Sequence, residues 1–144
     1  MNPAAATRTT INTSLRYRDA PAAIAWLCTA LGFERRAVYE DGAGGIAHAQ
    51  LTFGNGMLML STARDNDWGQ RMAQPDEIGG RETQVCCLTV ADADAHYARA
   101  VAAGAEIIEP LEAKDYGGKG YACRDPEGHL WWIGSYDPWA DAAS

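Results

Sequence analysis

The chain has 144 residues, of which 47% are hydrophobic and 22% are charged, a balance typical of one globular domain. Its 12 basic and 19 acidic residues give a net charge of −7, which disfavours non-specific binding to nucleic acid or anionic membrane and suits a cationic ligand. No apolar run approaches the roughly 20 residues that span a bilayer, and residues 1–10 lack the apolar core of a signal peptide, so we expect a cytoplasmic protein with a loose N-terminal arm.

The first predicted module covers residues 11–62. A strand over 11–18 leads into a helix that Asp19 caps and that ends at Gly32. Apolar residues recur along this helix at the spacing of one helical face, at Ile24, Leu27, Cys28 and Leu31. Glycine-rich turns then separate three further predicted strands, over 33–40, 45–53 and 56–62.

A polar segment, residues 63–82, is predicted as a linker with one helical turn around 68–72. The second module, residues 83–137, has the same order of elements as the first, and residues 138–144 form a tail. The predicted elements of the second module are a strand over 83–90, a helix over 93–103 capped by Asp92, and strands over 105–112, 118–124 and 128–136.

The two modules are copies of one pattern. Their landmark residues keep step at separations of 73, 72 and 72 positions: Asp19 with Asp92, Gly32 with Gly104, and Gly56 with Gly128. A helix covers only one face of a small sheet, so each module leaves an open, curved face. The sequence therefore predicts an α+β domain of paired βαβββ modules, with a mixed curved sheet and a ligand cleft between the modules.

Three segments carry a resemblance to a known family: YRDAPAAIAWLCTALGFE, VADADAHYARAVAAGAE and CRDPEGHLWWIGSY. Over residues 11–137 they resemble the vicinal oxygen chelate superfamily, in particular its glyoxalase and bleomycin-resistance group. The resemblance implies a small-molecule ligand and a homodimer. The residues leave open whether the modules pair within one chain or are exchanged between chains.

The resemblance also implies a divalent metal, held by His, Gln or Glu from the first and last strands of each module. The corresponding positions here are Asn12, Leu60, Val85 and Trp132. Three of these side chains cannot ligate a metal, and the amide of Asn12 is a weak donor. We therefore expect no metal and no cofactor, and not the usual metal-dependent isomerisation or ring cleavage.

Strand alternation predicts which side chains share the cleft with these four positions. They are Ser14, His48, Gln50 and Cys87, whereas Met59 is predicted to pack under the helix. The cleft is thus mainly apolar, with Trp132 as an aromatic wall suited to stacking on a flat ligand. His48 is a candidate hydrogen-bonding group or base, although histidines on strands more often serve structure.

The remaining polar and aromatic residues carry weaker signals. His96 is expected on the helix surface, and His129 is expected to point away from the cleft with Trp131. Trp68 and Tyr116 lie in predicted loops from which either can cap the cleft, and the tail containing Trp139 can dock on a partner subunit. The four cysteines lack zinc spacing and are expected as small buried thiols: Cys28, Cys86, Cys87 and Cys123.

These observations favour a metal-independent protein of the glyoxalase/bleomycin-resistance type that sequesters an aromatic or cationic compound. An alternative is a glyoxalase-like lyase or isomerase, or a dioxygenase-related enzyme, with a non-standard site and unknown catalytic residues. A third is a structural or regulatory module. Metal analysis of the purified protein and ligand-induced thermal shifts discriminate among the three.

Overall fold

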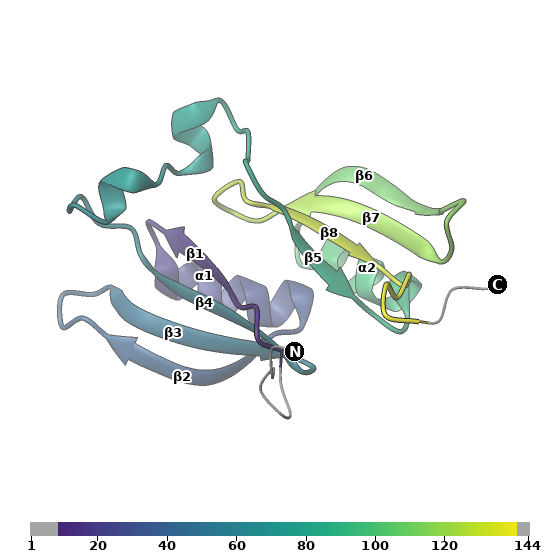
Figure 1. The fold of residues 1–144 in the computed structure, drawn as a ribbon, viewed down its shortest axis with the longest axis horizontal. Coiled ribbons are helices and arrows are strands. Elements are labelled where there is room, and N and C mark those ends of the chain that lie inside the picture. Colours follow the sequence, from purple (N-terminus) through teal and green to yellow (C-terminus); the bar gives the residue numbers. More distant parts are fainter. Residues whose placement is uncertain (1–8, 141–144) are drawn as a thin grey trace, which may run out of the picture.

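The computed structural model describes residues 9–140 and shows two βαβββ modules joined by a linker (Figure 1). Residues 1–8 of the predicted arm and 141–144 of the predicted tail lie outside the described part. Module one contains β1 (Thr13–Tyr17), α1 (Ala20–Trp26), η1 (Leu27–Leu31), β2 (Glu34–Glu40), β3 (Ile46–Phe53) and β4 (Gly56–Thr62). Module two contains β5 (Cys86–Thr89), α2 (Ala93–Ala102), β6 (Glu106–Ala113), β7 (Lys119–Arg124) and β8 (Leu130–Gly134). The predicted α+β class and order of elements are confirmed.

The helices begin and end at the landmark residues of the repeat. The Asp19 carboxylate accepts a hydrogen bond of 3.1 Å from the Ala22 N–H, and Asp92 accepts one of 3.0 Å from the Ala95 N–H. Gly32 follows the first helix with φ +87°, a left-handed conformation that glycine adopts without strain. None of the helices within residues 9–140 is long and apolar enough to cross a membrane.

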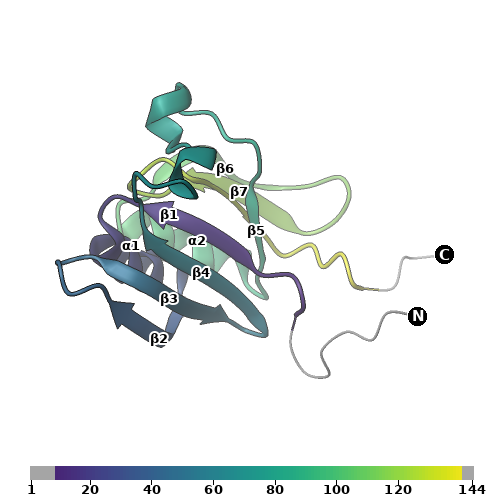
Figure 2. The same ribbon diagram turned by 60° about the vertical axis from the view of Figure 1, so that its left-hand side comes forward.

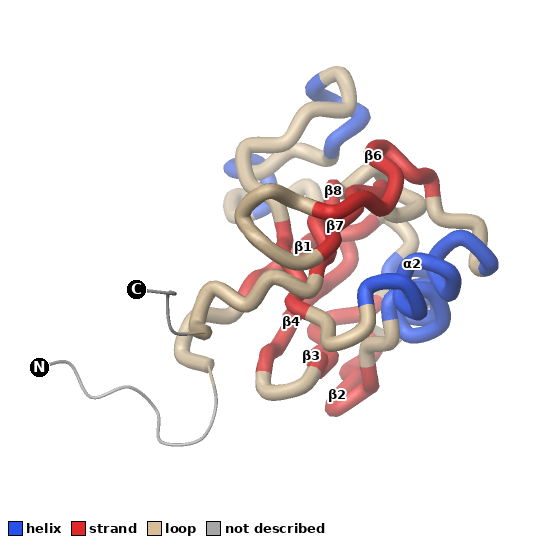
Figure 3. Tube along the Cα trace, turned by 90° about the vertical axis from the view of Figure 1, so that its right-hand side faces the viewer, coloured by secondary structure: helices blue, strands red, loops and turns tan. Residues whose placement is uncertain are grey.

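Each module forms its own four-stranded mixed sheet, in the orders β1-β4-β3-β2 and β5-β8-β7-β6. The first strand of each module runs parallel to the last, and the other neighbours are antiparallel. In Figure 1, α1 and α2 lie behind the sheets, and Figure 3 shows α2 on one side of the strands, apart from the short helices of the linker at the top. One face of each sheet therefore packs under a helix, and the opposite face is called the open face below.

The helix-covered faces of the two modules share a single hydrophobic core. The ring of Phe33 in module one lies 5.7 Å from that of Trp131 in module two, at an angle of 68°. Edge-on aromatic packing of this kind joins the modules where their helices meet. The open faces consequently lie outside this shared core.

The linker between the modules contains two short 3₁₀ helices, η2 (Gly69–Arg71) and η3 (Pro75–Ile78), so the predicted helical turn around 68–72 is confirmed. In Figures 1 and 2 it passes above β1. Between the two turns, the buried Gln74 side chain donates a hydrogen bond of 3.0 Å from Nε2 to the carbonyl of Arg16. The linker is thereby anchored to the end of the first strand.

Leu60 faces the core, so its predicted place in the cleft is wrong. It is 1% exposed and pairs with Leu15, and its counterpart in module two is Ile133. Trp132 therefore corresponds to Met59, which lies on the open face although it was expected under the helix. Leu60 follows Gly56 by four residues, whereas its counterpart Ile133 follows Gly128 by five. Counting from the two glycines therefore misaligns the strands by one residue, and a shift of one residue places a side chain on the opposite face of a sheet.

His96 lies between the modules, whereas an exposed position on the helix was expected. Its Nε2 donates a hydrogen bond of 2.8 Å to the carbonyl of Leu31 in η1. A carbonyl only accepts, so Nδ1 is the unprotonated nitrogen and accepts from the Tyr121 hydroxyl at 2.7 Å. Burial lowers the pKa of His96 below its ordinary value of 6.5, with the Arg99 charge acting in the same direction and the Leu31 bond opposing it.

This neutral His96 predicts a loss of stability in mild acid. The unfolded chain binds the proton more readily than the folded one, so the free energy of unfolding is at its full value above pH 6.5 and declines as the pH falls through the folded pKa. Urea denaturation at a series of pH values measures the slope. The His96→Gln variant should flatten it, and an unchanged slope in that variant would assign the effect to other groups.

Candidate functional site

The open face of module one carries a small polar and aromatic group on β2 and β3. His48 Nε2 lies 3.2 Å from Gln50 Oε1, and the ring of Tyr39 stacks on His48 with centroids 6.3 Å apart. Ser14 shares this face, because Ser14 and Gln50 both pair with Met59. His48, Gln50 and Ser14 are therefore on the face that alternation predicted.

Module two carries a hollow of about 190 Å³ on its open face. Trp132 pairs with Cys87 across β8 and β5, and both line it as expected. The rings of Tyr116 and Tyr136 pack edge to face, with centroids 5.2 Å apart, and complete an aromatic wall. We call this the tryptophan hollow, lined by Cys87, Leu88, Thr89, Lys114, Tyr116, Gly117, Lys119, Gly120, Trp132, Gly134, Tyr136 and Pro138.

Gly120, which pairs with Gly134 across β7 and β8, makes room for the Trp132 indole. A Cβ atom on Gly120 would lie 2.8 Å from Cζ2 of Trp132, and one on Gly134 would lie 2.8 Å from the carbonyl oxygen of Lys119. Both distances are too short for real contacts. The absence of side chains here lets Trp132 lie against the strand, as glycine in a strand often permits a close approach.

A lysine lies over the half-buried Trp132 ring of this hollow. Lys114 Nζ is 4.9 Å from the centroid of the Trp132 ring, within the range of a cation–π contact. The same ammonium donates a hydrogen bond of 2.9 Å to Glu112 Oε1, and this bond raises the pKa of Lys114. The ammonium therefore stays charged at neutral pH.

The predicted site residues thus fall into separate groups within one chain. Asn12 and Ser14 are exposed at the start of β1, while His48 and Gln50 lie half-buried further across the same sheet. Cys87 and Trp132 line the tryptophan hollow, and Val85 is half-exposed just before β5. Of the two loop aromatics, Tyr116 reaches the hollow and Trp68 lies in the linker, outside its lining.

The cysteines offer no activated nucleophile. All four cysteines are free. Cys87 was expected to be buried, but it is exposed. Burial raises the pKa of Cys86 and of Cys123 to about 12, and it also raises that of Cys87. A thiol with a raised pKa is mostly protonated at neutral pH and reacts poorly.

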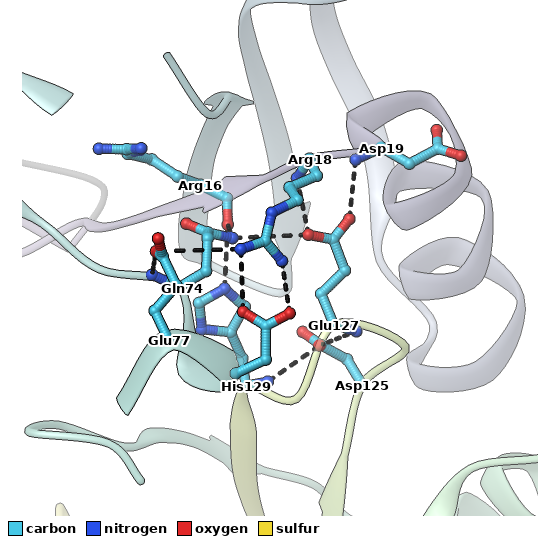
Figure 4. Close-up of polar contacts among 9 residues, drawn as sticks. Arg16, Arg18, Asp19, Gln74, Glu77, Asp125, Glu127 and His129 are labelled. Carbon is cyan, nitrogen blue, oxygen red and sulfur yellow. Dashed lines mark hydrogen bonds and ion pairs between the residues drawn. The ribbon is translucent and has the colours of Figure 1, made fainter. Parts of the chain in front are cut away.

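The DPEGH segment after β7 forms a joint between the modules, shown in Figure 4. Asp125 Oδ2 accepts a hydrogen bond of 2.6 Å from the Tyr17 hydroxyl at the end of β1. The Glu127 carboxylate accepts bonds from the backbone N–H groups of Arg18, at 2.6 Å, and Asp19, at 2.8 Å. Burial, followed by the charge of Asp125, raises the pKa of Tyr17 well above its ordinary value, so its hydroxyl remains a donor.

His129 belongs to the same joint. Its Nδ1 lies 2.9 Å from the Glu82 carboxylate and its Nε2 lies 3.0 Å from the carbonyl oxygen of Arg16. Its ring also packs edge-on against Tyr17, with centroids 5.0 Å apart. As predicted, His129 points away from the open face, and its contacts are those of a structural residue.

Residues 9–133 match the sequence model of the Glyoxalase/Bleomycin resistance protein/Dioxygenase superfamily. The chain belongs to this superfamily. Its two βαβββ modules and their mixed sheets are the fold that the resemblance implied. The match covers both modules, and it includes the open face of module one and most of the residues that line the tryptophan hollow.

Known relatives of this glyoxalase-superfamily chain include proteins matched by sequence and by structure. The Mycobacterium bovis protein Mb0911c, described as uncharacterized, is 33% identical over 91 residues, or 63% of this chain and 59% of that protein. The match thus spans less than two thirds of that relative's length. TioX from Micromonospora sp. ML1 is 32% identical, with a TM-score of 0.69 over 86% of this chain and 95% of its own.

A more distant structure shares the fold alone. The fosfomycin resistance protein FosX from Listeria monocytogenes is 13% identical, with a TM-score of 0.66 over 95% of this chain and 94% of its own. It was crystallised with Mn(II) and a dihydroxypropylphosphonic acid. This comparison raises the question of whether the present chain has residues that fit a metal.

The residues at the metal positions of the superfamily do not fit a divalent ion. With the strand register corrected, those positions hold Asn12, Met59, Val85 and Trp132. A divalent ion of this kind needs converging imidazole or carboxylate ligands, and these four offer only the amide of Asn12 and the soft thioether of Met59. Across residues 9–140, moreover, no group of three or more His, Cys, Asp or Glu side chains is arranged to hold a metal ion.

Proposed function

We propose that this chain is a metal-independent small-molecule-binding protein that holds an aromatic compound in the tryptophan hollow. The observation that carries the proposal is the hollow itself, in which Trp132 lies against Gly120 and the paired rings of Tyr116 and Tyr136 complete the aromatic lining. Binding alone, without making or breaking a bond, would sequester the compound.

The size and lining of the hollow support a single aromatic ring as the bound group. An apolar cavity of about 150 Å³ accepts benzene, and the hollow measures about 190 Å³. Sites for whole drug-sized ligands are larger, at roughly 300–1,000 Å³. A larger ligand would therefore place one ring in the hollow and extend beyond it.

A homodimer is part of the proposal, because it would cover the rest of such a ligand. The open faces contain apolar side chains that nothing within residues 9–140 covers, including Val85, which is 50% exposed. A second copy could bring its His48 and Gln50 toward the hollow, and the exposed Trp139 could pack on that copy. A cytoplasmic location also belongs to the proposal, since free cysteines persist in reducing compartments.

The enzyme alternative rests on His48, whose imidazole is placed to exchange protons with a ligand on the open face of module one. The described lining of the tryptophan hollow contains no His, Asp or Glu side chain, the most common general acids and bases. Binding without reaction is therefore the function that we propose. Analysis of an aromatic compound after incubation with the protein separates binding, which leaves the compound unchanged, from catalysis, which converts it to a product.

A thermal-shift titration of protein treated with a chelator tests the proposed function. A small aromatic compound should raise the melting temperature saturably, because a ligand at 100 times its Kd stabilises a protein by about 2.7 kcal/mol. The Kd should be the same after added Mn²⁺, Ni²⁺ or Zn²⁺. Binding that appears only with stoichiometric metal would contradict the proposal, and so would the lack of any saturable shift across aromatic compounds.

A further inference from the structure

The chain contains only two lysines, and both line the tryptophan hollow. Lys114 lies in the loop between β6 and β7, and Lys119 begins β7. Among the residues that the structure describes, the wall of the hollow contains no Asp or Glu side chain, although acidic residues outnumber basic ones by 19 to 12 in the whole chain. The charge of the hollow is thus opposite in sign to that of the protein as a whole.

The Lys114 ammonium already lies where a cationic ligand would bind. Its position 4.9 Å from the Trp132 ring centroid uses the attraction that an aromatic face offers to a cation. A second cation on the same face would meet a like charge at close range. The tryptophan hollow therefore disfavours the cationic ligands that the net charge of the chain suggested.

The present partners of both lysines are exchangeable. Glu112 lies outside the lining of the hollow and its side chain is 64% exposed, while Lys114 is only 14% exposed. Lys119 pairs with both oxygens of Asp94, at 3.1 Å each, and these two side chains are also well exposed. Exposed ion pairs contribute little to stability, so an anion inside the hollow can take the place of Glu112 at small cost.

We infer that the tryptophan hollow binds an aromatic ring bearing a carboxylate or a similar anionic group, with Lys114 as the counter-ion of that group. The ring packs against Trp132 and the anion accepts hydrogen bonds from the ammonium. Lys119, on the same wall, adds positive potential. This inference rests on the proposed function and specifies its ligand class.

Three compounds of nearly equal shape test the charge preference: benzoate, benzamide and benzamidine. Their Kd values are measured by ¹H–¹⁵N NMR titration of the full chain, following the indole N–H of Trp132, which is assigned by its loss in Trp132→Phe. Since charge-assisted hydrogen bonds are about twice as strong as neutral ones, we expect benzoate to bind roughly tenfold more tightly than benzamide, and benzamidine to bind most weakly.

Variants of Lys114 test whether this residue causes the preference for benzoate over benzamide. Lys114→Gln should bring benzoate to about the affinity of benzamide and leave benzamide within roughly twofold, whereas Lys114→Arg should keep the preference. Arg36→Gln removes one positive charge at an exposed position on β2, away from the hollow. This control variant should change neither the Kd of benzoate nor that of benzamide.

The outcomes separate this inference from the proposed function. If benzamide or benzamidine shifts the Trp132 indole with an affinity equal to or above that of benzoate, the charge inference is overturned and aromatic binding stands. If none of the three compounds shifts it, both are overturned. A preference for benzoate that survives in Lys114→Gln would also overturn the assignment to Lys114.

Discussion

Replacing Asp125 by alanine is expected to lower the free energy of unfolding by about 3–5 kcal/mol, because it leaves several donors without a partner and each unsatisfied buried group costs about 1–3 kcal/mol. Asp125 is 4% exposed. Its carboxylate accepts hydrogen bonds from the Tyr17 hydroxyl and the Trp131 indole, and from the backbone N–H groups of Glu127 and His129. Removing it leaves these four donors without that acceptor in a place that water reaches poorly.

Urea denaturation of Asp125→Ala and of three further variants checks this expectation. Asp67→Ala changes an exposed aspartate of the linker and should cost less than about 0.5 kcal/mol. Tyr17→Phe should cost less than Asp125→Ala, and the two changes together should cost less than their sum, because they remove the same bond between the modules. A cost below 1 kcal/mol for Asp125→Ala would show that the joint does not hold the modules together.

Trp132→Ala is expected to weaken the binding of benzoate by tenfold or more, since truncating a central aromatic contact commonly costs about 2 kcal/mol. The reason is that Trp132 supplies the ring surface of the hollow, whereas Cys87 beside it is small. Trp132→Phe should have an intermediate effect. The fold should survive both changes, because Trp132 lies on the open face and is only partly buried.

Trp68→Ala is the matched control for this prediction. Trp68 is 72% exposed in the linker and lies outside the lining of the hollow, so its loss should leave the Kd for benzoate within about twofold. Isothermal titration of the four proteins gives the comparison. Equal losses in Trp132→Ala and Trp68→Ala would contradict a specific role for Trp132.

The repeat made the fold predictable, because it depends on local signals that occur twice. Asp19 and Asp92 cap the two helices, and Gly32 adopts the left-handed conformation that ends the first. Alternation along β3 and β5 also placed His48 and Cys87 correctly on the open faces. These features follow from the residues of one segment and its nearest neighbours.

Features that depend on long-range geometry were missed. Leu60 was assigned to the wrong face because one extra residue in a distant turn changes the register, and residue spacing alone does not show where a strand begins. Lys114 and Tyr136 were not recognised, because they lie in loops whose direction depends on contacts with β8. His96 was expected at the surface, because the sequence does not show that Leu31 of the other module and Tyr121 of β7 both lie within reach of its ring.

A crystal structure of the chelator-treated protein with 4-bromobenzoate shows where an aromatic anion binds, because anomalous scattering from bromine locates the ligand without ambiguity. We predict a bromine peak in the tryptophan hollow, with the aromatic ring in contact with Trp132 and the carboxylate near Lys114. A ligand bound instead beside His48, or held through a metal ion, would contradict metal-independent binding in the tryptophan hollow.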